Sequence, residues 1–385
     1  MYETTGISVK VSRSVVQDGN WAVTLKDAIS SYSHEISTSH GFDTANVTFA
    51  VNRRNVSEWL DRGLGMDIDV RGPSGTQIWN GFVDNVSVNE GPRKISVGRL
   101  TEIANMVIAS YAIVIEDADE PIIGEQTSTE YASDTGSQDR YGIWEKVISA
   151  GARTVTEANQ IRDTVLAKYA YPTTSYAISA AIDMTITLQC AGYYRWLDAF
   201  TYNTTDNDEV TTNEKVLRLL AAEASVNNVL STDYTMVSTS SAYVSTFEDQ
   251  NRTALTIAKE CASFGDANND AWTFGVYEDR QAVFDIVPTT IEYAHRKGLG
   301  ATIERLSGST IDPWRVRPGQ WLFMPDIILG GEELPIPDTR AQLYMDKRVA
   351  FIERVQYSAP YGLNAHGTRL AKSSQGLAKW GLGSL

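Results

Sequence analysis

The sequence is poor in the two residue types that most often build metal sites and disulfide scaffolds. It contains two cysteines and four histidines in 385 residues. Cys190 and Cys261 are far apart and flanked by apolar residues, which favours buried free thiols over a disulfide and fits folding in a reducing compartment. No histidine has metal-ligand spacing to another histidine or cysteine, so we expect no metal and no cofactor. The four are His34, His40, His295 and His366.

Long apolar segments are also missing. A run such as "MVIASYAIVI" (106–115) is far shorter than the roughly 20 residues that a membrane-spanning helix needs. The N-terminus, "MYETTGISVKVSRS", has no apolar signal core and already alternates like a strand. We therefore expect no secretion signal and no membrane insertion by this chain.

Motifs that carry catalysis are absent as well. The sequence has no H-E-x-x-H, G-x-S-x-G, Walker or G-x-G-x-x-G pattern in a suitable context. "DANNDAW" matches the first three ligand positions of a calcium loop, but Ala271 replaces the required glycine and Tyr277 the chelating glutamate. "HEISTSHGFD", with His34 and His40, is predicted to be a surface loop. We predict solvated loops for the carboxylate pairs, and thus no catalytic, cofactor-binding or metal-binding residues; the pairs are Asp208/Glu209, Glu248/Asp249 and Glu332/Glu333.

The sequence also has few positively charged residues relative to negatively charged ones. The net charge is −15 and no block of lysine or arginine occurs. This argues against a surface that holds nucleic acid by neutralising phosphates. It is compatible with a surface past which nucleic acid slides without sticking.

In the first 100 residues, apolar and polar residues alternate along several segments. This pattern predicts half-buried strands. Turn signals such as "GPSGT" and "NEGP" separate the strands. We expect an antiparallel barrel or sandwich with one helical candidate at 55–63. The strand candidates are "ISVKVSRS", "NVTFAVNR", "GMDIDVRG", "IWNGFVDNVSV" and "KISVGRL".

The middle of the chain mixes strands and helices. A strand at 108–117 precedes a predicted exposed loop at 121–139, and a helix of about 155–170 begins with a Thr154–Glu157 capping box. Two strands follow within 184–202. Two amphipathic helices, the second ended by Gly265, and a hairpin around "DR" predict a small α/β unit inserted between β segments.

One strand has an echo near the C-terminus. "GFVDNVSV" (81–88) matches "AFIERVQY" (350–357), with Phe82/Phe351 and Val86/Val355 identical. Upstream, Trp59 aligns with Trp314, and Gly65 with Gly319 within one residue. Half-buried strands resemble one another by chance, so two interpretations stay open: coincidence, or two related β-domains. We interpret Gly81 as a bulge or a close backbone approach, with Ala350 at the matching place.

Several segments together, in order, resemble a tailed-phage hub protein of the baseplate or tail tip. They are the β-domain containing "IWNGFVDNVSV", "RYGIWEKVISAGARTVTEANQIRDTVLAKYAYP", "MTITLQCAGYYRWLDAF", "NEKVLRLLAAEA", "TALTIAKECASFGDANNDAWTFGVYEDRQAVFDIVP", "WRVRPGQWLFMPD" and "VAFIERVQYSAP".

The resemblance implies a mainly β, α+β chain with two related antiparallel β-barrel or sandwich domains of the tail-tube kind. We expect a first β-domain at 1–105, the first part of a second at 106–205, an inserted α/β domain at 206–300, completion of the second at 301–360, and a C-terminal extension at 361–385. Leu370, Leu377, Trp380 and Leu382 could dock that extension on a partner.

A structural, non-enzymatic virion protein, made in the host cytoplasm, follows from the same resemblance. Its expected partners are copies of itself in a trimer with pseudo-sixfold symmetry, a tail tube or distal tail protein, and a central spike, fibre or tape-measure protein. DNA would only pass through the lumen. The alternatives are a distal tail or tube protein forming a hexamer, a cell-wall carbohydrate-binding or degrading protein with its site near 202–214 and 325–347, and a secreted adhesin.

Overall fold

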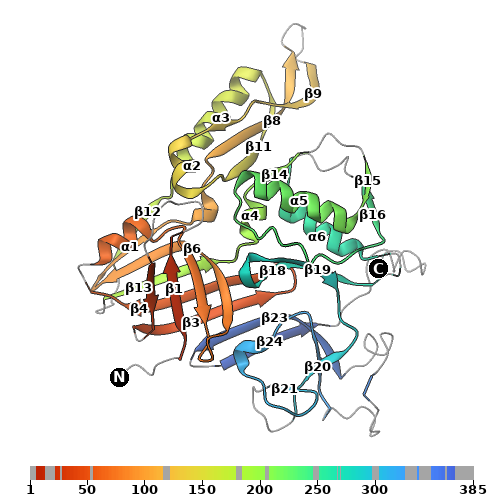
Figure 1. Cartoon of the computed structure of the whole chain (residues 1–385). Coiled ribbons are helices and arrows are strands. Elements are labelled where there is room, and N and C mark those ends of the chain that lie inside the picture. Colours follow the sequence, from red (N-terminus) through yellow and green to blue (C-terminus); the bar gives the residue numbers. More distant parts are fainter. Residues whose placement is uncertain are drawn as a thin grey trace.

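The protein is an α+β structure built mainly of strands, most of which belong to one large sheet (Figure 1). The computed structural model describes residues 6–13, 22–26, 28–52, 55–115, 122–178, 184–203, 208–245, 251–266, 268, 270–296, 303–325, 336–337, 348–359 and 362–368. The residues at 370–382 that we expected to dock on a partner lie outside this set.

The large sheet has 16 strands. They are β1 (Ser8–Ser12), β2 (Ala22–Leu25), β3 (Ile29–Ser37), β4 (Gly41–Ala50), β5 (Asp67–Arg71), β6 (Gln77–Glu90), β7 (Arg93–Val97), β12 (Thr174–Ile178), β13 (Met184–Ala191), β18 (Trp272–Val276), β19 (Ala282–Ile286), β20 (Ile291–Ala294), β21 (Glu304–Arg305), β22 (Trp321–Phe323), β23 (Val349–Ala359) and β24 (Gly362–Thr368). Its main path is β2–β1–β5–β6–β13–β4–β3–β23–β22–β20–β21, and the other strands join at the sides.

Two separate barrels, which the sequence led us to expect, are not what these strands form. The sheet continues from the N-terminal strands into the C-terminal ones because β3 pairs with β23, with Ile36 opposite Val355. Alternation of apolar residues fixes which face of a strand is buried but leaves its neighbour open, so the sequence could not show this pairing. All five expected segments contribute strands to the sheet, and their boundaries stay a prediction.

A smaller sheet projects from the large one together with a helix (Figure 1). It contains β8 (Met106–Ile115), β9 (Ile122–Ser128), β10 (Ala132–Ser133) and β11 (Glu145–Arg153), and α3 (Val155–Tyr169) packs on β8 through Ala158. The predicted helix and its Thr154–Glu157 capping box are confirmed.

The predicted loop at 121–139 is wrong. It contains β9, β10 and the start of α2 (Thr135–Tyr141), whose first turn is capped by the Asp134 carboxylate. β9 pairs with β8 on one side only, and an edge strand of this kind can carry many polar residues. This polar composition suggested a loop.

The inserted α/β unit holds two helices packed on the sheet. They are α5 (Thr212–Val226) and α6 (Ala254–Phe264), both beginning at a threonine cap, and Gly265 ends α6 with a φ of 70° as predicted. The predicted hairpin is β18–β19. Short elements complete the fold: α1 (Val56–Arg62), α4 (Arg195–Asp198), β14 (Thr201–Tyr202), β15 (Glu209–Thr211), β16 (Tyr243–Ser245), β17 (Arg252–Thr253), and 3-10 turns at Leu100–Glu102, Glu278–Arg280 and Pro313–Arg315.

Two large apolar clusters cover opposite faces of β6. Val83 and Val86 belong to a core shared with β3, β4 and β13, whereas Phe82 packs with Trp144 and Trp196 in a core that includes α5 and α6. Cys190 and Cys261 are free and buried, as predicted. Among the described residues, none of the helices is long and apolar enough to span a membrane.

Candidate functional site

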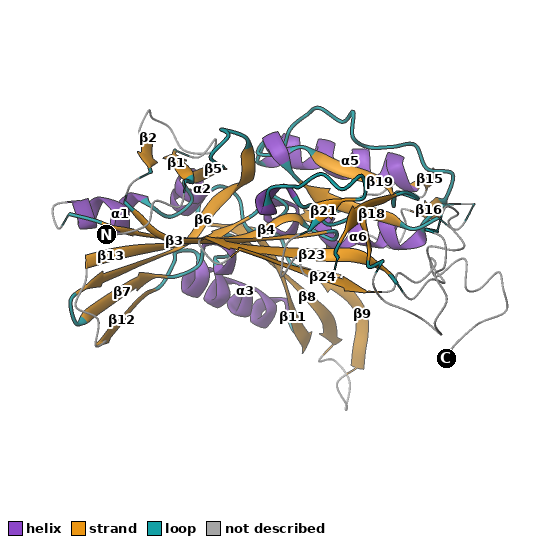
Figure 2. Ribbon diagram, turned by 90° about the horizontal axis from the view of Figure 1, so that it is seen from below, coloured by secondary structure: helices purple, strands orange, loops and turns teal. Residues whose placement is uncertain are grey.

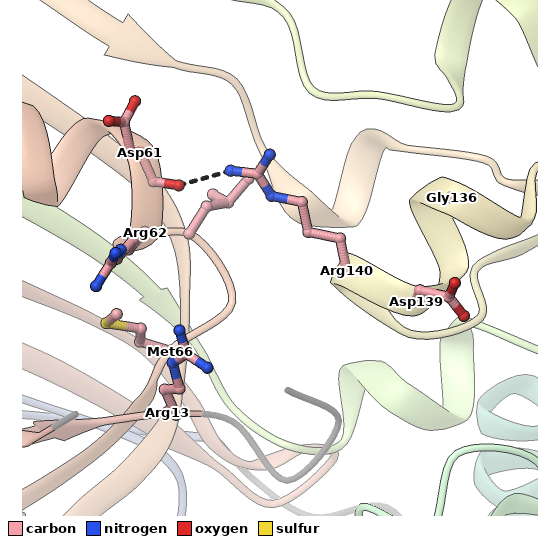
Figure 3. A pocket seen from close by; sticks show the side chains of 8 residues that line it. Arg13, Asp61, Arg62, Met66, Gly136, Asp139 and Arg140 are labelled. Atoms are coloured by element: carbon pink, nitrogen blue, oxygen red, sulfur yellow. Dashed lines mark hydrogen bonds between the residues drawn. The ribbon is translucent and has the colours of Figure 1, made fainter. Parts of the chain in front are cut away.

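The first hollow that could hold a ligand lies between α1 and α2 (Figure 3). Its volume is about 380 Å³, and both signs of charge line it. The Arg140 guanidinium donates a hydrogen bond to the Asp61 carbonyl oxygen at 2.6 Å, so it ties the two helices together. No nucleophile with a base beside it occurs in the lining, which is Arg13, Asp61, Arg62, Leu64, Met66, Gly136, Asp139 and Arg140.

A second hollow of about 600 Å³ carries carboxylates, the groups that glycoside hydrolysis requires. Burial raises the pKa of Glu145, but its Oε2 accepts the Thr201 backbone N–H at 2.7 Å. Glu102 and Asp198 also line this hollow. If the chain degraded cell wall, this hollow would be the place to test. Of the two loops that the sequence suggested for it, 325–347 lies almost entirely outside the described residues, whereas 202–214 is described except for 204–207 and contains β15 and the start of α5.

Of the two histidines of "HEISTSHGFD", His34 is not on a surface loop, which corrects the prediction, whereas His40 lies in the partly exposed turn between β3 and β4. His34 is buried in β3, where Tyr32 Oη lies 2.9 Å from its Nδ1 and its ring packs on Tyr357. Burial, followed by the nearby Arg317 charge, lowers the pKa of His34 to about 3. His34 lies in a strand because β3 pairs with β4 on one side and β23 on the other. The polar composition of the segment suggested a loop instead, so the sequence did not reveal this strand.

His40 belongs to a half-buried polar cluster. Its Nδ1 lies 3.0 Å from Asp43 Oδ2, its Nε2 lies 2.6 Å from Lys259 Nζ, and Tyr194 Oη donates to Asp43 Oδ1 at 2.7 Å. The tautomer with its proton on Nδ1 satisfies these contacts, donating to Asp43 and accepting from Lys259. Burial raises the pKa of Asp43, but the hydrogen bonds from His40 and Tyr194 outweigh it and leave the pKa below its usual value. The cluster joins β4 to α6.

The calcium-like turn and the carboxylate pairs form no site in the part of the chain that the structure describes. Asp266 Oδ1 accepts the backbone N–H groups of Asn268 and Asp270, both at 2.9 Å, so its own loop occupies it. No three of the described His, Cys, Asp and Glu side chains are grouped as metal ligands. Asp208 and Glu209 lie just before α5, and the other two pairs are outside the described residues.

The sequence echo, by contrast, corresponds to repeated backbone geometry. Gly65 has a φ of 78° and Gly319 one of 85°, and each lies two residues before the strand (β5 or β22) that pairs with its copy of the echo. The Gly65 N–H donates to the Val83 carbonyl and the Gly319 N–H to the Ile352 carbonyl, both at 2.8 Å. Val83 and Ile352 are matched positions of the echo, so the glycines correspond without any offset.

A bulge recurs at the acidic position of the echo. Opposite β13 the register skips Asp84, between Val83 and Asn85. Opposite β24 it skips Glu353, between Ile352 and Arg354. A bulge at the same place in both strands is a specific feature that chance alternation does not produce, so the structure favours duplication over coincidence.

The flanking strands repeat as well. β6 has β5 and then β7 on one side and β13 on the other; β23 has β22 and then β3 on one side and β24 on the other, all antiparallel. Next to β7 lies β12, and next to β3 lies β4. We call β12–β7–β6–β13 the first module and β4–β3–β23–β24 the second module. The two meet where β13 pairs with β4.

Gly81 is a close backbone approach rather than a bulge. A Cβ at this position would lie 2.2 Å from the Ala191 carbonyl oxygen and 2.4 Å from the Trp79 ring. The sequence interpretation is therefore confirmed in its second form, and the bulge lies three positions further on.

The outer strands of the two modules are the part that sequence reasoning missed. In the described residues β12 pairs with β7 alone and β24 with β23 alone. All five residues of β12 are exposed, including Tyr176 at 77% and Ile178 at 92%. Two large apolar side chains in the short strand "TSYAI" were the available signal. In Figure 1 the label of β12 lies above this group of strands and that of β24 below it, and Figure 2 shows β7 and β12 at the margin of the molecule.

Comparison with known proteins gives a distant structural likeness. No protein-family model matches the chain, and no curated protein matches it. Among solved structures, the chain is similar to the 43 kDa tail protein of prophage MuSo2 from Shewanella oneidensis, with a TM-score of 0.41 and 9% identity over 94% of this chain and 97% of that one. At this TM-score the likeness by itself carries no argument about function.

Proposed function

We propose that the chain is a structural hub of a phage tail tip or baseplate. Three copies would form a ring that joins the tail tube to a central spike or fibre. The observation that carries the proposal is the repeat of a four-strand module within one sheet. Three chains with two modules each supply six similar positions, which suits a part between a sixfold tube and a threefold spike.

Open strand edges support a ring over a monomer. An edge strand presents unpaired N–H and C=O groups, and closure of a sheet into a ring removes them. The sheet formed by the two modules ends at β12 and β24, and within the described residues neither edge has a further partner strand.

The acidic charge fits a conduit for DNA. With a net charge of −15, the chain repels phosphates over distances of about the 8 Å Debye length at physiological salt. DNA would then pass the ring without binding to it. The other proposed partners are a tail tube or distal tail protein on one face and a spike, fibre or tape-measure protein on the other.

Native mass measurement of the purified protein tests this function. We expect three chains per particle, and low-resolution images should show a ring with a central opening. A ring of six chains would instead support the alternative assignment, a distal tail or tube protein. A protein that stays monomeric at high concentration would overturn both.

A degradation assay tests the enzymatic alternative. We expect no release of soluble glycan or peptide when the purified protein is incubated with peptidoglycan. Release that disappears in Glu145→Gln and persists in Asp139→Asn, which lines the other hollow, would overturn the structural assignment.

A further inference from the structure

We propose that β12 of one chain pairs antiparallel with β24 of a neighbouring copy, in a register that the internal junction between the modules defines. The inference rests on the self-association part of the proposed function. It does not depend on the virion location or on the partners of the ring.

The internal junction is the template. β13 of the first module pairs with β4 of the second over seven residues, from Thr185 opposite Ala50 to Ala191 opposite Thr44. β24 takes the place of β13 in the second module, and β12 takes the place of β4 in the first. The same junction, repeated between chains, therefore joins β24 to β12.

The register follows from matched partners. Val86 and Val355 correspond, and they lie opposite Leu188 and Ala365, so Ala365 takes the place of Leu188. By the same route through β7 and β3, Ile178 takes the place of Val47. Leu188 lies opposite Val47 inside the chain.

The same steps place four pairs between neighbouring chains, which are Ala365 opposite Ile178, His366 opposite Ala177, Gly367 opposite Tyr176, and Thr368 opposite Ser175.

Burial at the matched positions supports this pairing. Tyr176 corresponds to Ala45 and Ile178 to Val47, and both of these are buried in the core of the sheet, at 1% and 0% exposure. Ser175 and Ala177 correspond to Thr44 and Asn46, which are exposed. β12 thus has apolar residues at the two positions that the internal junction buries, although in a single chain they face solvent.

The composition of both strands also fits pairing. Soluble proteins protect edge strands with charges, prolines or bulges that prevent association. Neither "TSYAI" nor "GLNAHGT" contains a charged Asp, Glu, Lys or Arg, or a proline. A second copy of this chain is the occupant that these edges fit, because each edge repeats one side of a junction that the chain already forms.

Cysteine cross-linking tests the register. Residues directly opposite in an antiparallel pair have Cα atoms about 4.5–5.5 Å apart, within the 4.4–6.8 Å that a disulfide allows. The matched variant is Ile178→Cys with Ala365→Cys. The control is Thr174→Cys with Ala365→Cys, which moves the β12 cysteine four residues along the same face, by about 13 Å.

Oxidation of the matched variant should give disulfide-linked multimers up to the native ring size on a non-reducing gel, at least tenfold more than the control. Equal cross-linking in both, or none in either while the native mass remains that of a ring, would overturn the edge pairing and leave the proposed function standing. A wild-type protein that stays monomeric would overturn both.

A second variant tests the same edge without cysteines. Tyr176→Lys with Ile178→Lys should yield a monomer whose thermal midpoint matches that of monomeric wild-type protein at high dilution, because both side chains are exposed in the single chain. A ring that persists with both lysines in place would contradict the proposal.

Discussion

The central strands of the two modules have the same backbone and different surroundings. β6 is buried continuously from Ile78 to Val88, whereas β23 alternates between buried and partly exposed residues. β6 lies between two large cores, one of them formed with α5 and α6. The side chains of β23 are divided among one of these large cores, which contains Tyr357 and Ala359, and two smaller clusters with β20, β22 and β24.

This difference shows which residues the duplicated backbone needs. Both modules keep three features. A glycine at positive φ precedes the neighbouring strand, β5 or β22; a small residue stands at 81 or 350; and an acidic residue stands at the bulge. Side chains that pack into the surrounding apolar cores have diverged, as at the matched positions Val88 and Tyr357. Substitutions at matched positions should therefore separate the demands of the backbone from those of the packing.

The largest effect is expected at Gly81. Any Cβ meets the Ala191 carbonyl oxygen, so Gly81→Ala should lower the free energy of unfolding by about 1–3 kcal/mol, and Gly81→Leu should prevent folding. Ala350→Gly, the reverse change in the second module, should cost only about 0.5–1 kcal/mol. Urea unfolding measures all three, and a Gly81→Ala variant as stable as wild type would refute the close approach.

The second effect is the dependence of stability on pH that His34 gives to the second module. His34 lies opposite Tyr357, where the first module has Ile95 opposite Val88. Because the pKa of His34 is lowered to about 3 in the fold and is near 6.5 in the unfolded chain, the unfolded state binds the proton first as the pH falls. Stability is full above about pH 6.5 and declines below it by about 1.4 kcal/mol per pH unit.

The matched variant is His34→Gln, whose side-chain oxygen can still accept from Tyr32. It keeps all other titrating groups, so the difference between its pH profile and that of wild type isolates His34. Parallel profiles between pH 6.5 and 4 would show that His34 is not held neutral.

The third effect concerns the two bulges. Asp84 Oδ1 accepts the Thr101 backbone N–H at 2.8 Å, so Asp84→Ala leaves a half-buried donor without its partner and should cost about 1–3 kcal/mol. Asp84→Asn keeps the acceptor and serves as the control. Glu353→Ala should cost less, because Glu353 is only half-buried. Equal losses at both bulges in chemical denaturation would contradict this contrast.

A smaller effect than at Gly81 is expected at the positive-φ glycine of the second module. At Gly319 a Cβ would meet only Thr38 Cγ2, at 3.9 Å, so Gly319→Ala should cost only backbone strain of about 1–2 kcal/mol. Gly319→Asn should recover part of this, since asparagine tolerates positive φ. Thermal unfolding that ranks Asn below Ala would argue against strain as the cause.

Local features of the fold were predictable from the sequence, and its long-range pairings were not. The α3 capping box, the Gly265 cap and the β18–β19 hairpin depend on neighbours within a few residues, which the sequence displays directly. The pairing of β3 with β23 depends on residues more than 300 positions apart and on a register that alternation leaves open.

The candidate site was predictable only at its centre. The echo identified β6 and β23 because Phe82/Phe351 and Val86/Val355 are identical, but β12 and β4 have no identical residues at matched positions that would reveal their equivalence. The prediction that His34 lies on a loop was wrong for a similar reason. A strand with polar residues on its exposed face has the composition of a loop, and the sequence does not show which strands pair with it.

The pairing of β3 with β23 also has a consequence for synthesis. The Glu35 carboxylate accepts a hydrogen bond from Gln356, 321 residues later in the chain. At elongation rates of about 5–20 residues per second, the ribosome needs about 15–60 s to reach this partner after β3 has emerged. During that time the nascent polypeptide presents an incomplete sheet to other growing chains. We expect its yield in cells to follow the supply of chaperones that shield such intermediates more closely than it follows the stability of the finished protein.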